Sequence, residues 1–409
     1  MKRIPTPASR RNRYVDFRRA AGRFIETLEL YSSRFFGEDS TPFALTGAFA
    51  VGLLTVSLIT GALLLFWYVP LPDRALIETT RLIRDVPLGS LILATHRVSA
   101  DLLILVVLLH LVRNWATGRY RGPRARTWII GLAALPLVGL IAWAGYVLPW
   151  DERAMVLLAW GHDLISAPDR WPIIGWLKLG SVLSWPVFSA ENEADLLLRV
   201  FALHLGGALF IIWLVMWHLR RVTPPRVRLP ILTWIILVAF VLFVAAMVPI
   251  EGERLLPFNP LAPPTSVAVD SIACFPLLLY PLLGAPLLTA LIALIWLGLT
   301  FLPRLEPLNP IVACVHDTAC VGCRLCLQDC PYGAIEMKPH YDPRRRALGR
   351  EIARVIPEHC IACGICVGSC AFGAIELPAL TSGEITARIE RALEPAESLA
   401  PASNERGAA

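Results

Sequence analysis

The sequence predicts an all-α membrane protein, a bundle of six transmembrane helices, followed by a small α+β domain at the C-terminal end. Of the 409 residues, 56% are hydrophobic and 17% are charged, whereas soluble domains carry roughly 25% charge. The apolar residues gather in six long stretches before residue 303. Nine of the ten cysteines lie within residues 314–370, so they serve one local unit and not a disulfide framework along the whole chain.

The composition also excludes several classes of protein. A mean hydropathy of +0.59 is incompatible with a simple cytosolic enzyme, a disordered protein or a nucleic-acid-binding module. The net charge of +6 is more typical of basic cytoplasmic loops in a membrane protein than of an acidic partner.

Each apolar stretch is long enough to cross a bilayer, which takes roughly 20 helical residues. We expect the crossings near residues 43–69, 90–114, 127–148, 196–219, 229–249 and 276–302. Residues 1–42 are rich in arginine, and the part from Tyr14 to Phe36 is predicted to be an amphipathic helix that lies on the membrane surface.

Loop charges predict the orientation in the membrane. The loops at 113–126 and 220–228 are basic, whereas the loop at 150–195 is acidic. The positive-inside rule therefore places both termini and the cysteine-rich unit in the cytoplasm of a multi-pass protein of the bacterial inner membrane. That compartment is reducing, which favours metal binding by the cysteines over disulfide formation.

Four histidines lie inside predicted crossings. His96 and His110 share the second crossing, and His204 and His218 share the fourth, with 14 residues between the members of each pair. Fourteen residues are nearly four helical turns, so each pair lies on one helix face about 21 Å apart. Two such helices side by side make two stacked bis-histidine sites, each suited to a haem b with imidazole axial ligands. Hydrogen-bonding histidines between helices are the alternative.

Four glycines share the period of the histidines. Gly47 and Gly61 lie in the first crossing, and Gly131 and Gly145 lie in the third, again 14 residues apart. A glycine lets a flat macrocycle approach the backbone, although close helix packing also uses glycine. The period that these glycines share with the histidines makes them evidence for haem binding beside the histidines.

These segments resemble cytochrome b of quinol-oxidising bc and b6f complexes, and the b6 type most closely. The resemblance is carried by His-Arg-Val-Ser-Ala at 96–100, His-Leu-Val-Arg at 110–113, Gly-Tyr-Val-Leu-Pro-Trp-Asp at 145–151 and Pro-Asp at 168–169. It implies a dihaem cytochrome b domain over residues 43–222 and the possibility of a homodimer.

The resemblance also implies which histidines act together. His96 would pair with His204 near the periplasmic side, and His110 with His218 near the cytoplasmic side. Three arginines near these histidines are candidate partners of haem propionates, since guanidinium groups suit carboxylates: Arg97, Arg113 and Arg199. Arginines that reach toward the membrane interface are the alternative for each.

Residues 223–308 resemble subunit IV of the b6f complex and would add two crossings. Residues 259–264, Asn-Pro-Leu-Ala-Pro-Pro, resemble the approach to the Pro-Glu-Trp-Tyr motif that this family uses in quinol oxidation. This chain has Val-Asp-Ser-Ile at 269–272 instead, so only the acidic position is kept. We predict that Asp270 accepts a proton from quinol; a helix-capping or solvated aspartate is the alternative.

The cysteine-rich unit contains one motif twice. Residues 320–330 and 360–370 both read Cys-x-x-Cys-x-x-Cys-x-x-x-Cys, and Tyr-Gly-Ala-Ile-Glu after the first copy returns as Phe-Gly-Ala-Ile-Glu after the second. This run is typical of bacterial 2[4Fe–4S] ferredoxins, in which the fourth cysteine binds the other cluster. We therefore expect a ferredoxin domain over residues 309–378, followed by a helix and a disordered tail over 379–409.

The motif predicts two sets of cluster ligands: Cys320, Cys323, Cys326 and Cys370 in one, and Cys360, Cys363, Cys366 and Cys330 in the other. Thiolates are soft ligands that suit iron. Two zinc sites are the alternative, which the third cysteine of each run and the duplication disfavour. Cys274 and Cys314 lie outside the motif and are expected to be buried, inert thiols.

Together these features predict a membrane electron-transfer subunit that links a cytoplasmic iron–sulfur redox partner to the quinone pool. Its cofactors would be two [4Fe–4S] clusters and two b-type haems; its partners would be quinone, membrane lipid and other redox subunits, with no nucleic acid. One alternative is a cytochrome b subunit of a bc/b6f-type quinol oxidoreductase with separate Rieske and cytochrome c subunits. The other is a non-catalytic redox anchor for a peripheral hydrogenase or dehydrogenase.

Overall fold

Long apolar helices build the first of the two units into which the chain divides, Met1–Leu308 and Asn309–Ala409. The computed structural model describes residues 13–36, 43, 45–121, 124–220, 229–248, 256–257, 259, 270–305, 312–340, 351–360 and 362–377. The predicted tail helix and disordered end at 379–409 lie outside these residues.

Five helical segments of the described chain are long and apolar enough to cross a membrane: α2 (Thr46–Leu64), α4 (Gly89–Ala116), α5 (Ala125–Val147), α8 (Glu193–Leu219) and Phe275–Arg304, which contains most of α10 (Tyr280–Leu305). The predicted crossing at 229–249 corresponds to α9 (Ile231–Met247), an apolar helix of 17 residues. The predicted all-α membrane fold is confirmed, whereas the count of six crossings stays a prediction.

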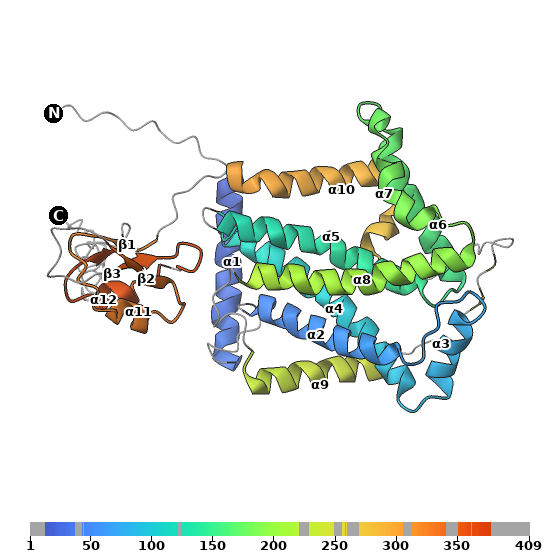
Figure 1. Cartoon of the computed structure of the whole chain (residues 1–409), viewed down its shortest axis with the longest axis horizontal. Helices are drawn as coiled ribbons and strands as arrows, with labels where there is room; N and C mark the ends of the chain where they lie inside the picture. Colours follow the sequence, from blue (N-terminus) through green and yellow to red (C-terminus); the bar gives the residue numbers. More distant parts are fainter. Residues whose placement is uncertain are drawn as a thin grey trace, which may run out of the picture. The chain divides into compact units, whose positions relative to one another are not determined.

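The first four of these segments form two antiparallel pairs. α2 packs against α4 and α5 against α8, and α9 and α10 run alongside them (Figure 1). The hydroxyls of Ser57 and Ser99 lie 2.7 Å apart and join α2 to α4 in the interior of the bundle. Gly284 interrupts the start of α10 with a φ of 66°, a conformation that glycine adopts without steric cost.

At one end of the bundle, helix α1 (Arg13–Phe36) lies across the other helices (Figure 1). Its outer side exposes Phe17, Phe24 and Phe35. Its inner side contacts α4 so closely that a Cβ on Gly22 would lie 2.8 Å from the carbonyl oxygen of Ala116. An amphipathic helix with aromatic residues on one side suits the membrane interface.

At the opposite end, the acidic 150–195 segment folds into helices α6 (Glu152–Ser166) and α7 (Leu179–Phe188), near α3 (Ala75–Arg84) (Figure 1). Asp151 caps α6 by accepting a hydrogen bond of 3.0 Å from the backbone of Ala154, as a helix N-cap should. Two short 3₁₀ helices at 167–170 and 175–177 join α6 to α7, and another at 275–279 precedes α10. The largest buried apolar cluster lies where α5, α6 and α8 meet.

The second unit has the predicted α+β composition. It contains two antiparallel two-stranded sheets, β1 with β4 and β2 with β3, and two short helices. Their bounds are β1 Cys314–Val315, α11 Leu325–Asp329, β2 Ile335–Pro339, β3 Glu351–Val355, α12 Ile365–Gly368 and β4 Ile375–Glu376. Ile335, Ala353 and Ile375 form its core together with several cysteines. Each motif therefore runs through a loop and a short helix into a strand.

The two cysteines outside the motif differ from each other. Cys274 is buried, as expected, with 2% of its surface exposed. Cys314 is exposed, so the prediction of a buried thiol there is wrong. Cys314 lies in β1, which pairs with β4 in a two-stranded sheet of the described residues, and its side chain lies at an exposed position of that strand.

Candidate redox sites

His96 on α4 and His204 on α8 face each other across the bundle. The centroids of their rings lie 6.2 Å apart, with an angle of 72° between the ring planes. Because a metal–imidazole bond is about 2 Å long, two axial imidazoles on one metal ion have centroids roughly 6 Å apart. The spacing of this pair fits an iron ion between the rings.

The outer nitrogen of each of these rings has a partner. His96 Nδ1 lies 2.9 Å from the carbonyl oxygen of Ser57 and 3.2 Å from the hydroxyl of Thr60. His204 Nδ1 lies 2.8 Å from the carbonyl oxygen of Ile141. A carbonyl partner requires Nδ1 to donate its proton, which leaves Nε2 with a free lone pair, as a metal ligand needs.

Each of these rings packs directly against the backbone of a glycine on the neighbouring helix. A Cβ on Gly61 would lie 2.9 Å from Cε1 of His96, and a Cβ on Gly145 would lie 2.8 Å from Cε1 of His204. Atoms cannot approach so closely without displacement, so any larger residue would push the ring away. The imidazole rings themselves therefore occupy the space beside these glycines, which the sequence predicts for a macrocycle.

The second layer repeats this arrangement nearer to α1. His110 on α4 lies close to His218 on α8. A Cβ on Gly47 would lie 3.1 Å from Cε1 of His110, and one on Gly131 would lie 3.2 Å from Cε1 of His218. The hydroxyl of Thr46 lies 3.1 Å from Nδ1 of His110. All four histidines and all four glycines predicted from the period of 14 are thus brought together, in two layers.

A cavity of about 430 Å³ opens at the first layer. Its lining includes both histidines and both glycines, His96, His204, Gly61 and Gly145, and its polar side chains include Arg97 and Tyr146. This volume lies within the range of about 300–1,000 Å³ that is usual for ligand and cofactor sites. Two facing imidazoles, room at their edges and a mostly apolar wall fit a b-type haem.

The arginines predicted to meet propionates have different surroundings. Arg97 lines the cavity, and its guanidinium carbon lies 5.5 Å from the ring centroid of Tyr146. Arg113 is 5% exposed and forms an ion pair of 2.6 Å with Glu29 of α1. The structure therefore gives Arg113 a carboxylate partner from its own chain, which the spacing of residues along the sequence did not indicate.

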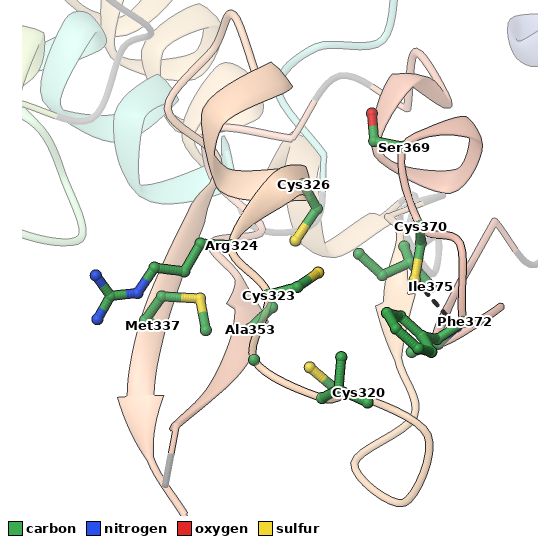
Figure 2. A pocket seen from close by; sticks show the side chains of 13 residues that line it. Cys320, Cys323, Arg324, Cys326, Met337, Ala353, Ser369, Cys370, Phe372 and Ile375 are labelled. Atoms are coloured by element: carbon green, nitrogen blue, oxygen red, sulfur yellow. Dashed lines mark hydrogen bonds between the residues drawn. The ribbon is translucent and has the colours of Figure 1, made fainter. Parts of the chain in front are cut away.

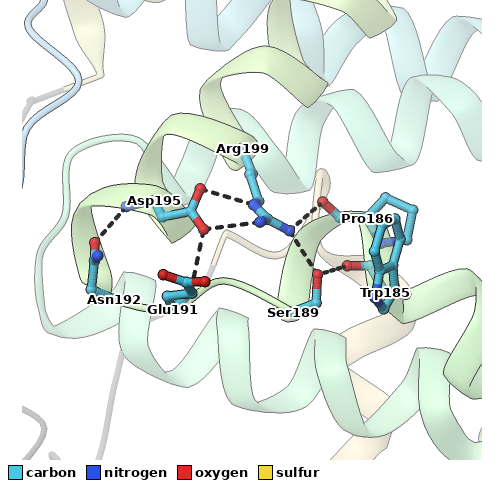
Figure 3. Close-up of polar contacts among 7 residues, drawn as sticks. All are labelled: Trp185, Pro186, Ser189, Glu191, Asn192, Asp195 and Arg199. Carbon is cyan, nitrogen blue, oxygen red and sulfur yellow. Dashed lines mark hydrogen bonds and ion pairs between the residues drawn. The ribbon is translucent and has the colours of Figure 1, made fainter.

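Arg199 belongs to a polar network at the start of α8 (Figure 3). Its guanidinium donates to both carboxylate oxygens of Asp195, each at 2.9 Å. It also donates to the hydroxyl of Ser189 at 2.7 Å and to the carbonyl oxygen of Pro186 at 3.3 Å. Arg199 therefore joins the end of α7 to the start of α8, because its partners Pro186 and Ser189 lie at the end of α7 and Asp195 lies in the first turn of α8.

Asp270 lies before α10 and caps the turn that follows it. One carboxylate oxygen accepts hydrogen bonds of 2.8 Å from the backbone N–H groups of Ile272 and Ala273. This is the capping geometry named above as the alternative. The same carboxylate also interacts with the hydroxyl of Tyr146, so the predicted proton-accepting role stays a prediction.

Asp101 is a candidate site residue that the pattern of histidines and glycines does not indicate. This residue lies in α4, five positions after His96, and the hydroxyl of Tyr146 donates a long hydrogen bond of 3.4 Å to its carboxylate. A signal was available, because a carboxylate inside an apolar crossing is costly and usually functional.

The second unit gathers the two predicted cysteine sets at two pockets. Cys320, Cys323, Cys326 and Cys370 line one, with their side chains arranged around a common space (Figure 2). Cys330, Cys360, Cys363 and Cys366 line the other. Among the described residues, no three His, Cys, Asp or Glu side chains are close enough to hold a single metal ion. Four thiols around each pocket fit a [4Fe–4S] cluster.

The fourth cysteine of each motif accepts a hydrogen bond in the same way. The backbone N–H of Ala334 donates to Sγ of Cys330 at 3.3 Å, and that of Ala374 donates to Sγ of Cys370 at 3.2 Å. Hydrogen bonds to cluster sulfurs are one means by which proteins set reduction potentials. The duplication in the sequence is therefore also a duplication of these contacts.

Both motifs use left-handed backbone at equivalent positions. Gly322 and Ala362 have φ values of 73° and 61°, and Arg324 and Gly364 have values of 66° and 80°. Only glycine adopts this conformation without steric cost. Each equivalent pair thus contains one glycine and one larger residue, which shows that both loops need the conformation whichever residue stands there.

Burial affects the protonation of the inner thiols. Desolvation raises the pKa of the Cys366 thiol to about 11 and also raises the pKa of Cys326. Both thiols are therefore protonated at neutral pH without metal. Because thiolate is the ligand form, metal binding must displace these protons.

Comparisons with known proteins agree with this geometry. Residues 39–224 match the family model for Cytochrome b/b6/petB, and residues 319–374 match that for the 4Fe-4S dicluster domain. Cytochrome b of Rickettsia conorii is 34% identical over 179 residues, which are 42% of this chain and 42% of that protein. Cytochrome b6 of Prochlorothrix hollandica is 28% identical over 174 residues, which are 42% of this chain and 75% of that protein.

A solved structure of a hyperthermophilic respiratory Complex III contains a chain of similar fold. It is 20% identical, with a TM-score of 0.54, and the match covers 72% of this chain and 82% of that chain. A cytochrome b domain implies haem b, and a dicluster domain implies iron–sulfur clusters, in an integral membrane protein. Residues 39–224 therefore form a cytochrome b/b6 domain, and residues 319–374 form a 4Fe-4S dicluster domain.

Proposed function

We propose that this chain is a membrane electron-transfer subunit that links an iron–sulfur redox partner to the quinone pool. The observation that carries the proposal is the presence, in one chain, of two layers of facing histidines and two pockets of four cysteines. When bound, haems and clusters each supply one-electron chemistry. A quinone is the two-electron partner that a cytochrome b domain in the membrane implies.

The side chains have defined tasks in this proposal. His96 and His204 would hold one haem, and His110 and His218 the other, while carbonyl partners such as Ile141 keep the ring nitrogens in the required tautomer. The helix rise separates the two layers by about 21 Å. Apolar side chains around the cavity exclude water, and the cysteine sets would each hold one [4Fe–4S] cluster. By the positive-inside rule, the cluster domain and both termini lie in the cytoplasm.

The test is a redox titration of the chain purified in mild detergent, followed by optical and EPR spectra. Two b-type haems and two [4Fe–4S] clusters per chain are expected, with haems that a reduced ferredoxin reduces and a short-chain quinone reoxidises. His204→Ala should remove one haem, whereas His162→Ala, on α6 outside both layers, should remove none. A chain with one haem or none would contradict the proposal. Quinone activity only with a tightly bound catalytic subunit would favour a redox anchor instead.

A second candidate is the cytochrome b subunit of a bc/b6f-type quinol oxidoreductase with separate Rieske and cytochrome c subunits. The position of Asp270 beside Tyr146 favours it, as does the likeness of fold to the Complex III chain. Sensitivity to quinol-site inhibitors that is lost in Asp270→Asn would support this candidate. Equal activity of the variant and the natural chain would count against it.

A further inference from the structure

Two carboxyl groups face one phenol beside the first histidine layer. The hydroxyl of Tyr146 lies 3.4 Å from Oδ1 and 3.5 Å from Oδ2 of Asp101. The carboxylate of Asp270 interacts with the same hydroxyl from the turn that precedes α10. The side chain of Tyr146 also lines the cavity together with His96. Tyr146 therefore connects both acids to the cavity wall.

The charges around this group favour the binding of one proton. Arg97, Cys274 and Tyr146 face the two acids. The ion pair between Arg153 and Asp151 interacts with Arg97 and completes the charged groups of this region. With all three carboxylates and both guanidiniums ionised, the group carries a net charge of −1. Uncompensated charge inside a membrane bundle is costly. One added proton makes the group neutral.

We propose that Asp101 and Asp270, bridged by Tyr146, form a proton-binding site coupled to electron transfer at His96 and His204. When an electron from a one-electron donor arrives at that centre, one carboxylate takes a proton from a hydronium ion of the bulk water. The new carboxyl O–H bond forms as an O–H bond of the hydronium ion breaks, which leaves a water molecule. The proton leaves again when the electron leaves, so the charge of this region is unchanged over the cycle. In a low-dielectric interior, such compensation favours reduction. The inference rests on the proposed function, because it needs a haem between these histidines.

The experiment is a mediated redox titration of the full chain with its haems, at several pH values between about 5.5 and 8.5. In the natural chain, the midpoint potential of the affected haem should fall with rising pH, by up to about 59 mV per pH unit for one proton per electron. Asp101→Asn should at least halve this slope, and Tyr146→Phe should reduce it. Glu193→Gln, an exposed acid-to-amide change at the start of α8, should leave the slope unchanged.

Infrared difference spectra of the oxidised and reduced chain supply a second measurement. Reduction should produce a carboxylic acid C=O band that Asp101→Asn shifts or removes. If Asp101→Asn binds no haem, two other results test the inference. These are the reduced pH slope of the potential in Tyr146→Phe and the carboxylic acid band in the natural chain. A potential independent of pH in a natural chain with both haems would overturn this inference and leave the proposed function intact. A chain without haem would overturn the proposed function itself.

Discussion

At the residue scale, the closest approaches in the bundle are those between glycine backbones and imidazole rings. Gly145→Ala adds a methyl group where Cε1 of His204 lies 2.8 Å away. We expect the ring to move from its axial position, because the backbone of two packed helices gives way less readily than a side chain. The measurement is the haem content of the purified chain, which should fall from two haems to one.

The matched control lies on the same helix. A Cβ on Gly139 would have no heavy atom within 4 Å, so Gly139→Ala should keep both haems. Equal haem content in the two variants would show that the contact between Gly145 and His204 does not limit cofactor binding.

Asp169 accepts hydrogen bonds at the start of α7, and its carboxyl makes the stability of this part of the fold depend on pH. The hydroxyl of Ser181, together with the backbone N–H groups of Gly180 and Ser181, lowers the pKa of the Asp169 carboxyl. A carboxyl with a lowered pKa stabilises the folded state at pH values above its usual pKa of 3.8. This stabilisation is lost as the pH falls through the lowered pKa. Asp169→Asn should therefore reduce the melting temperature at pH 6, with a difference that shrinks on acidification below about pH 4.

Asp85→Asn, an exposed substitution at the end of α3, is the control for a change of one charge. A deficit of Asp169→Asn that stays constant down to pH 2 would contradict the carboxylate as its source.

At the scale of the element, α1 is held to the bundle by the ion pair between Glu29 and Arg113. Glu29→Ala leaves a nearly buried guanidinium without its carboxylate, which should cost roughly 2 kcal/mol, since breaking a fully buried pair costs more. Hydrogen exchange of the α1 amides should then accelerate about 30-fold. Glu26→Ala changes an exposed acid of the same helix and should alter exchange little. Similar protection in both variants would mean that the other contacts of α1 dock it without this ion pair.

The cluster-binding loops depend on backbone conformation. Gly322 has a φ of 73°, and a Cβ there would lie 2.6 Å from the carbonyl oxygen of Glu351 in β3. Gly322→Ala should destabilise the second unit by about 2 kcal/mol, seen as earlier loss of cluster absorbance on heating. Gly368→Ala is the control, since a Cβ at this α12 position meets nothing within 4 Å. An unchanged melting curve for Gly322→Ala would contradict the close contact.

The helices of the bundle could be predicted from the sequence because their period and length have local causes. The predicted stretches at 90–114 and 127–148 agree with α4 and α5 within a few residues. The helices of the 150–195 segment and the pairing of Glu29 with Arg113 could not be predicted in this way. Residue type does not reveal which carboxylate pairs with which guanidinium, because that pairing is formed only when distant segments come together in the fold. The two cysteine sets that share pockets were predictable because a period of 40 relates them.

At the scale of the whole molecule, the chain combines two units that have separate cores. Cys326→Ser removes one thiolate from the first cysteine set. Iron bound in clusters should fall from about eight to about four atoms per chain, measured by iron analysis and EPR, while both haems stay. Cys314→Ser replaces an exposed thiol outside the pockets and should change neither. Loss of haem in Cys326→Ser would show that the units depend on each other for assembly.

The order of glycine and histidine in the bundle has a further consequence. The α2–α4 pair and the α5–α8 pair present the same glycine and histidine positions, so the four helices have an approximate twofold axis. At the first layer this axis relates Arg97 to Leu205 and Tyr146 to Ala62, and all four line the cavity. A flat cofactor with unlike edges therefore meets equivalent walls on its two faces. Arg97 and Tyr146 break this symmetry, as do Ser57, Glu78 and Thr79 of the same lining, so the two orientations of the cofactor are not equivalent.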